Sequence, residues 1–524
     1  MTDGCSNEKK QSQVQKQMTK DLNLKYSHLF DTDHIKNDVH KKSIRGGVAN
    51  ITSQGFTFGL TFIRVAILAR LLTPDDYGVF GMVMVMASFA VIFKDIGLST
   101  ATIREKHITH SQVSNLFWIN VLIGIVAMLI IIAVSPLIVW FYNEPRLLWV
   151  SVLISIAFFF AGLSVQHQAI LKRQMRFDKI ALVTIVSSVL SAVIGVLLAW
   201  QGFSYWSLVW TYISMNFFIF IGMWCFTGWL PSFPKKHVGT KVLLKVGLHV
   251  AGLNAFSTVT MYLDRIIVGR ISNAETLGLY DRGKILPEML TGRIRMALFS
   301  IALPALSSLQ NDSKRFCNFY YKFLNMISWT TIPIAVFCFV FADECIPIFF
   351  GPQWKTSAFY MKFFAIKALV MPAVTSLDQV PLALGFSKRY MYAGMVRCFA
   401  AILCVSLGVY FYGITGAAIG VAVSDIIIFI PFFFMCTKDS DLSFLNYIKA
   451  TSVPFLVSLL IGLSMILVKK PLEDQSVIYA IILMSSYFGI TFICFVISDY
   501  FVIGSQLGLV KTLLNHIKNK RANA

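Results

Sequence analysis

The sequence has few charged residues, no closely paired cysteines and no long polar stretch after its first forty or so residues. Only 14% of its 524 residues are charged, whereas 56% are hydrophobic. A water-soluble domain cannot bury so much apolar surface, so the composition excludes a soluble enzyme or binding module. The nine cysteines form no C-x-x-C pair. Their scatter argues against a metal site and against a disulfide framework.

The chain also lacks the signatures of common catalytic sites. It contains no H-E-x-x-H, no P-loop and no G-x-S-x-G. The outer turns expected between its hydrophobic runs are short, and the longest, near 342–355, is too small to hold a catalytic domain. We therefore expect no enzyme, no cofactor and no metal. Without an ATPase motif, any energy for transport must come from an ion gradient, the membrane potential or the substrate gradient.

Apolar runs long enough to cross a bilayer recur along the chain, separated by short polar turns. They predict about fourteen transmembrane helices. The first run starts near Gly46, behind a Lys-, Gln- and Asp-rich segment, so we expect no secretory signal peptide. The segment 507–520 alternates apolar residues with lysine and predicts an interfacial helix. The predicted spans are 46–71, 77–103, 114–142, 147–170, 179–200, 204–229, 247–271, 284–308, 318–342, 357–385, 390–412, 415–436, 446–468 and 476–500.

The net charge of +20 would suit a nucleic-acid partner, but the positions of the basic residues indicate a membrane instead. With the N-terminus placed in the cytoplasm, roughly 22 Lys and Arg residues flank the inner helix ends and roughly 6 flank the outer ends. This asymmetry is the positive-inside pattern and predicts that both termini are cytoplasmic. We expect membrane lipid, and no nucleic acid, as a partner.

One phrase occurs twice, 200 residues apart, at the end of a hydrophobic run. It reads ILARLLTPDDYGVF at 67–80 and IVGRISNAETLGLY at 267–280. Thr73 and Asn273 can cap the helices that follow, and the glycines allow close approach of backbones. The phrase therefore predicts a structural hinge in each of two homologous halves. The hinge residues are Arg70, Gly78, Arg270 and Gly278.

The repeat predicts an all-α polytopic membrane protein with two pseudo-symmetric lobes of about six helices each, plus two extra helices. An even number of spans in each lobe makes the repeats parallel, and such two-lobed proteins are usually transporters. The predicted segments are a cytoplasmic polar tail, disordered or lying on the surface (1–42), the N-lobe (43–230), a basic cytoplasmic linker (231–246), the C-lobe (247–436), helices 13 and 14 (437–500), and a cytoplasmic amphipathic tail (501–524).

Ionisable residues inside the predicted spans are the candidate functional residues, because charges in hydrocarbon usually face a partner or a wet cavity. Arg64 and Arg265 lie at near-equivalent places before the repeated arginines. If both point inward, they form a cationic cleft that suits a diphosphate, which guanidinium groups bind with paired hydrogen bonds. The candidates for this cavity are Arg64, Arg265, Lys94, Lys362, Lys367 and Arg397. The candidates for ion or proton coupling are Asp264, Asp378 and Asp425.

The same residues also have structural interpretations. Asp264 and Arg265 are neighbours that point to different faces, and each can pair across helices. Arg295 can extend toward the membrane interface. Two G-x-x-x-G pairs, starting at Gly55 and at Gly416, are typical of close helix packing rather than of a binding site.

Several short runs of the sequence form a characteristic set. They are ARLLTPDDYG (69–78), GLSTA (97–101), FWIN (117–120), FYNE (141–144), LKRQMRF (171–177), DRIIVGR (264–270), LGLY (277–280) and PALSSLQ (304–310). Together these runs resemble the polysaccharide-transporter branch of the MOP exporter superfamily. In particular, the chain resembles lipopolysaccharide-biosynthesis exporters of the colanic-acid and teichuronic-acid kind, over roughly residues 43–435.

This resemblance implies a bacterial inner-membrane flippase for undecaprenyl-diphosphate-linked oligosaccharide units of O-antigen, capsule or exopolysaccharide. It implies two helical bundles in a V shape that work by alternating access, with basic residues in the cavity, for which Arg64 and Arg265 are the candidates. The implied partners are the lipid-linked oligosaccharide and membrane lipid, with a polysaccharide polymerase and glycosyltransferases as further candidates.

Two alternatives remain open. A cation-coupled multidrug exporter of the same superfamily often places an acid in its first helix, but the predicted helix 46–71 contains neither Asp nor Glu. A membrane glycosyltransferase or polymerase would normally present acidic residues on a larger external loop, which this sequence lacks.

Overall fold

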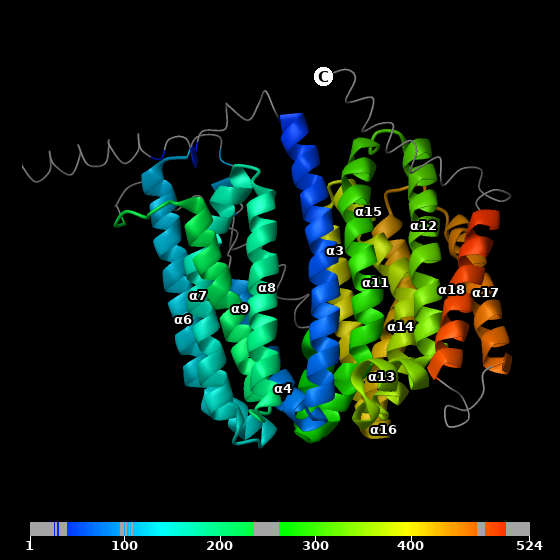
Figure 1. The fold of residues 1–524 in the computed structure, drawn as a ribbon. Coiled ribbons are helices and arrows are strands. Elements are labelled where there is room, and N and C mark those ends of the chain that lie inside the picture. The colour runs from blue at the N-terminus through cyan, green and yellow to red at the C-terminus, as the bar shows by residue number, and fades with distance from the viewer. Residues whose placement is uncertain are drawn as a thin grey trace, which may run out of the picture. The chain divides into compact units, whose positions relative to one another are not determined.

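The computed structural model describes residues 26, 29–30, 39–94, 99, 102–103, 105, 108–234, 261–468 and 477–498, which form helices and turns with no strand among them (Figure 1). Ten of the described helices are long and apolar enough to cross a membrane, which confirms an all-α, multi-pass membrane protein. The helices are α3 (Val39–Leu71), α4 (Pro74–Lys94), α6 (His110–Tyr142), α7 (Leu147–Arg173), α8 (Phe177–Trp200), α9 (Trp206–Thr227), α11 (Ala274–Ser308), α12 (Ser313–Val340), α13 (Ala342–Phe350), the 3-10 helix η1 (Pro352–Trp354), α14 (Ser357–Leu377), α15 (Gln379–Ala383), α16 (Ser387–Thr437), α17 (Phe444–Val468) and α18 (Val477–Ser498).

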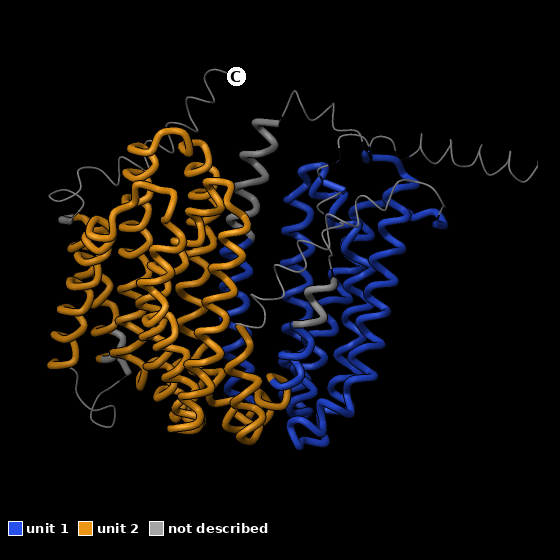
Figure 2. The backbone as a smooth tube through the Cα atoms, turned by 180° about the vertical axis from the view of Figure 1, so that it is seen from behind, with its two compact units in different colours: residues 1–72, 82–258 blue, residues 73–81, 259–524 orange. Residues whose placement is uncertain are grey.

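The chain divides into two compact units, which Figure 2 shows in different colours. Unit 1 comprises residues 1–72 and 82–258, and unit 2 comprises residues 73–81 and 259–524. The start of α4 therefore belongs to unit 2, although it follows the first copy of the repeated helix in sequence. The predicted amphipathic tail and most of the basic linker lie outside the described residues.

Unit 1 is built on close contact between α6 and α7. A Cβ atom added to Gly124 would lie 2.7 Å from the carbonyl oxygen of Phe158, and one added to Gly162 would lie 2.7 Å from that of Asn120. Both distances are too short for a side chain, so these glycines let the two backbones touch. Helix α7 also packs along α9, and α8 packs along α9 and α3.

Part of the predicted polar tail is buried in unit 1. Tyr26, Leu29 and Phe30 are helical and only 5–6% exposed, and they pack in the same apolar cluster as the ends of α6 and α7. Arg173, at the end of α7, donates to the carbonyl oxygens of Phe30 at 3.0 Å and Thr102 at 2.8 Å. The prediction of a disordered or surface-lying tail is therefore wrong at these three residues, because their apolar side chains fill a groove that hydropathy alone does not reveal.

Unit 2 is organised around α12, which packs against α11, α14 and α17. Its core is strongly aromatic: Tyr320 and Phe323 of α12 pack with Phe432 and Phe433 of α16 and with Tyr447 of α17. The hydroxyl groups are satisfied, since Tyr447 donates to the carbonyl oxygen of Ala373 at 2.6 Å. This dense core gives unit 2 the rigidity on which its charged side chains depend.

One predicted boundary differs from the structure. The segment 342–355, expected to be an outer turn, forms α13 and η1, and Trp354 is fully buried against the ring of Tyr77 at 5.4 Å between centroids. A second boundary is confirmed. The element α16 consists of two helices that meet at non-helical backbone at Tyr412 and Gly413, where the predicted spans 390–412 and 415–436 adjoin.

The two G-x-x-x-G pairs have different surroundings. Added Cβ atoms at Gly416 and Gly420 would lie well within 3.0 Å of the carbonyl oxygens of Gly408 and Cys404. The halves of α16 therefore pack backbone to backbone, as predicted for this pair. At Gly55 and Gly59, an added Cβ would meet no atom of the described residues within 4 Å, so close packing at this pair stays a prediction.

Candidate functional site

The two copies of the repeated phrase begin α4 and α11 with similar caps. The backbone N–H of Asp76 donates to the hydroxyl oxygen of Thr73 at 3.3 Å, and the N–H of Thr73 donates back to the Asp76 carboxylate at 2.9 Å. In the second copy, the N–H of Thr276 donates to the side-chain oxygen of Asn273 at 3.0 Å. These contacts confirm the predicted capping of both helices.

The starts of α4 and α11 cross each other inside unit 2, and the contact that one copy of the repeat makes is mirrored by the other copy. An added Cβ at Gly78 would collide with the carbonyl group of Ala274, and one at Gly278 would collide with the carbonyl group of Pro74, both far inside 3.0 Å. Pro74 and Ala274 occupy equivalent places in the repeat, as do the two glycines. The prediction that these glycines permit close backbone approach is therefore confirmed, and the two copies contact each other directly.

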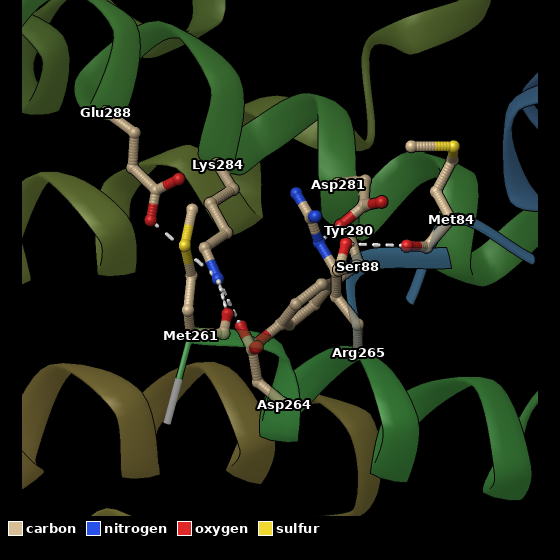
Figure 3. Close-up of polar contacts among 9 residues, drawn as sticks. All are labelled: Met84, Ser88, Met261, Asp264, Arg265, Tyr280, Asp281, Lys284 and Glu288. Carbon is tan, nitrogen blue, oxygen red and sulfur yellow. Dashed lines mark hydrogen bonds and ion pairs between the residues drawn. The ribbon is translucent and has the colours of Figure 1, made fainter. Parts of the chain in front are cut away.

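Next to this crossing lies a group of buried and partly buried polar side chains that we call the Lys284 cluster, comprising Asp264, Arg265, Tyr280, Asp281, Lys284 and Glu288 (Figure 3). Lys284 and Asp264 are each only 3% exposed, and Lys284 Nζ lies 2.7 Å from Asp264 Oδ2. Tyr280 donates its hydroxyl to the same oxygen at 3.1 Å. Glu288 Oε1 lies 3.7 Å from Lys284 Nζ. The cluster ties the helical residues 261–271 to α11.

Arg265 belongs to the same cluster but uses a different partner. Its Nε donates to Asp281 Oδ1 at 2.6 Å, and the two side chains are 22% and 10% exposed. Adjacent residues on one helix thus pair with positions one turn apart on α11. This geometry confirms that Asp264 and Arg265 point to different faces and pair across helices.

A second group, the Arg397 cluster, joins α11, α14 and both halves of α16. Arg397 Nη1 lies 3.3 Å from Asp378 Oδ2, and Arg397 Nε lies 3.6 Å from Asp425 Oδ1. Asp378 stands at the junction of α14 and α15, and Asp425 is 4% exposed. Arg295 interacts electrostatically with both carboxylates, with Glu288 and, repulsively, with Arg397.

The charges of these two clusters nearly cancel. In the Lys284 cluster, three carboxylates face one ammonium and one guanidinium, and Lys367 adds a further positive charge that acts on Asp264. In the Arg397 cluster, two carboxylates face two guanidinium groups. Buried charges are tolerated when they are paired in this way, because the mutual attraction offsets the loss of hydration.

The residues predicted for a cationic cavity lie in different surroundings. Arg265 and Arg397 are paired with carboxylates, as described above. Lys362 pairs with Asp343 at 2.9 Å, and this pair is well exposed, at 37% and 48%. Lys367 is half-buried on α14, and Arg64 is half-buried on α3 of unit 1. A shared cavity for all of them remains a prediction.

The remaining predicted positions lie at helix ends. Arg70 and Arg270 are both exposed, next to the caps of α4 and α11, where a structural role is expected. Lys94 is the last residue of α4, and its side chain lies outside the described residues. The coupling candidates Asp264, Asp378 and Asp425 each lie beside a cationic side chain of the chain itself.

Lys284 is the first residue of the predicted span 284–308 but was not among the candidate functional residues. The repeat contains a signal that could have revealed it. In the register that aligns Gly78 with Gly278, Asp264 corresponds to Arg64 and Lys284 corresponds to Met84. The acid and the lysine of the second half are thus both replaced in the first half, as expected for two residues that need each other.

Among the described residues, no group of three or more His, Cys, Asp or Glu side chains is arranged to hold a metal ion. The clusters instead consist of acids interleaved with arginine and lysine. Such paired charges can hold neighbouring helices together inside a membrane protein, and they can form new ion pairs when the helices move.

Three characterised relatives are similar to this chain over most of its length. Lipopolysaccharide biosynthesis protein WzxC of Escherichia coli (strain K12) is 21% identical, with 80% of this chain and 86% of that protein covered. Succinoglycan biosynthesis transport protein ExoT of Rhizobium meliloti (strain 1021) is 21% identical, with 81% and 86% covered. Teichuronic acid biosynthesis protein TuaB of Bacillus subtilis (strain 168) is 21% identical, with 77% and 84% covered.

Solved structures show the same fold. A lipid II flippase, MurJ, in an inward closed conformation matches 87% of this chain and 100% of its own at 14% identity, with a TM-score of 0.69. An inward-facing multidrug MATE transporter of the MOP superfamily matches 74% and 97% at 12% identity, with a TM-score of 0.56. The family described as "Polysaccharide biosynthesis protein" matches residues 67–359, which is more than half of the chain. Both capped helix starts, the repeat-crossing contacts described above and the Lys284 cluster lie within that range. The chain belongs to this family.

Proposed function

We propose that the chain is a flippase that moves undecaprenyl-diphosphate-linked oligosaccharide units across the bacterial inner membrane for the synthesis of surface polysaccharide. The observation that carries this proposal is the family match across the membrane helices, with relatives named for polysaccharide biosynthesis and transport. The likeness of fold to a lipid II flippase supports a membrane protein of the same architecture. The basic residues at alternate helix ends favour a cytoplasmic location for both termini.

The proposed mechanism follows from the absence of an ATPase motif and from the composition of the helices. The glycan head group enters a polar path from the cytoplasm while the polyprenyl tail remains in lipid. Alternating access then exposes the head group on the other side. A polysaccharide polymerase and glycosyltransferases would use and supply the transported unit, which makes them the candidate partners.

Arg64 is the substrate-binding residue that the repeat favours most. It places a guanidinium group in unit 1 at the position that holds the Asp264 carboxylate in unit 2. The apolar part of its helix, Gln54–Leu71, contains no acidic residue. Arg265 and Arg397 pair with carboxylates of unit 2. A guanidinium group binds a diphosphate with paired, charge-assisted hydrogen bonds.

The function is tested by deleting the chain in its native host. We expect surface polysaccharide to disappear and the lipid-linked oligosaccharide to accumulate on the cytoplasmic face, where an added periplasmic glycosidase cannot reach it. Re-expression of the full chain restores both. Normal polysaccharide in the deletion strain, or increased sensitivity to drugs without loss of glycan, would instead favour the multidrug exporter.

Arg64→Gln should reduce surface polysaccharide to about a tenth of the wild-type amount or less, because a lost charge-assisted hydrogen bond to phosphate weakens binding by roughly 10- to 100-fold. Arg64→Lys should give an amount of surface polysaccharide between those of the wild type and Arg64→Gln, since lysine keeps the charge but loses the bidentate geometry. Glycan is measured against the amount of membrane-inserted protein. Arg315→Gln is the matched control, since Arg315 is 78% exposed.

The deletion strain tests the flippase function, and the Arg64 variants test whether Arg64 binds the substrate. Full glycan output from Arg64→Gln at normal protein level would remove Arg64 from the binding path while leaving the flippase function supported by the deletion strain. Equal loss in Arg64→Gln and Arg315→Gln would mean that the assay reports general damage to the protein.

A further inference from the structure

The buried side chain of Lys284 ends among oxygen atoms of unit 2, two of them from buried residues or backbone and one from Glu288, which is 34% exposed (Figure 3). Its Nζ lies 2.7 Å from Asp264 Oδ2, 3.5 Å from the carbonyl oxygen of Met261 and 3.7 Å from Glu288 Oε1. Lysine and aspartate are almost completely buried, at 3% exposure each. The ammonium group is therefore held by the protein and separated from water.

These oxygen atoms are of the kind that also bind a free cation. Two carboxylates and a backbone carbonyl are the hard ligands that alkali and alkaline-earth ions prefer. Asp264 Oδ1 is buried and makes no hydrogen bond, so the shell retains acceptor capacity that the lysine does not use. In this structure the shell is occupied by the ammonium group of Lys284.

The internal repeat provides an independent argument that the acid and the lysine act as one unit. At the equivalent positions of the first half, Arg64 replaces Asp264 and Met84 replaces Lys284. Neither member of the pair is retained without the other. If Lys284 only filled space, its replacement by methionine in the first half would not require the aspartate to be replaced as well.

We propose that Lys284 is a tethered cation that fills an oxygen-lined cation site between residues 261–271 and α11, so that unit 2 takes up no exchangeable sodium or potassium there. The role of this site in transport rests on the proposed flippase function, but the occupancy of the site does not. Removal of the lysine side chain should convert the shell into a site for a small free ammonium ion.

The test uses the purified full-length protein in detergent and follows its thermal unfolding. Lys284→Ala should lower Tm by roughly 5–10 °C, because Asp264 loses its buried counter-charge. Ethylammonium, which replaces the deleted amine and part of its stem, should raise Tm in a saturable way. Choline, which has no N–H donor, should not, and neither salt should affect the wild-type protein. Lys355→Ala is the matched control, since Lys355 is exposed.

A second variant keeps the proposal testable if Lys284→Ala yields no folded protein. Asp264→Asn combined with Lys284→Met removes both charges, and it should be recovered in higher yield than Lys284→Met alone and should show no response to ethylammonium. The proposal fails if sodium stabilises the wild-type protein saturably above choline, if ethylammonium has no effect on Lys284→Ala, or if the double variant is no better than the single one. None of these measurements depends on transport, so their failure would leave the proposed function standing.

Discussion

Arg397→Met should be among the most damaging single substitutions in unit 2. It removes the guanidinium group that lies 3.3 Å from the partly exposed Asp378 and 3.6 Å from the buried Asp425, so that Arg295 alone offsets two carboxylates. Breaking a buried ionic group costs about 3–5 kcal/mol when a net charge is left inside the protein. We expect a fall in Tm of roughly 10 °C in detergent and a large loss of protein from the membrane.

A second substitution separates the effect of charge from the effect of packing. The double variant Arg397→Met and Asp425→Asn should regain most of the stability lost in the single variant, because Arg295 then offsets the one remaining carboxylate, that of Asp378. Arg315→Met, at a side chain that is 78% exposed, should match the wild-type protein. If the double variant is less stable than Arg397→Met, the loss comes from packing rather than from charge.

The second large effect is expected at the crossing of α4 and α11. In Gly278→Ala the new Cβ would occupy the space of the carbonyl group of Pro74, and in Gly78→Ala that of Ala274. The obstructing atoms belong to the backbone, so neither helix can yield by turning a side chain. We expect each variant to lose about 3 kcal/mol or more and to accumulate poorly in the membrane, as measured by thermal unfolding and by yield.

The matched control for this prediction lies in the same helix. Gly292 is within α11, and an added Cβ there would meet no atom of the described residues within 4 Å. Gly292→Ala should therefore leave stability unchanged or raise it by up to about 1 kcal/mol, because alanine favours a helix more than glycine does. Equal stability of Gly278→Ala and Gly292→Ala would show that the crossing is not closed in the native protein.

The repeated phrase shows how far local sequence can be trusted. Its caps and its close-approach glycines were predictable because each depends on a few neighbouring residues: Thr73 and Asp76 bond within one turn, and Asn273 bonds to Thr276. What the phrase did not reveal is that the two copies pack against each other, since residues 73–81 join unit 2.

The charged residues show the opposite case. Arg265 was selected from sequence as a member of a cationic cavity, yet it donates to Asp281, 16 residues away on another helix. Lys284 was not selected at all, although it begins the predicted span 284–308. Its burial depends on Asp264, 20 residues earlier, and no local pattern records that contact.

The amino-acid sequence alone established that this is an all-α membrane protein and where most of its described spans begin and end, because hydropathy and capping depend on residues close together in the chain. It also indicated that Gly78 and Gly278 allow close approach of backbones, but not that the two copies cross each other. The pairing of its charges was settled only by the folded helices. Whether a buried arginine or lysine can bind a substrate depends on which carboxylate lies within a few ångströms of it, and that distance is set by packing between helices that are remote in sequence.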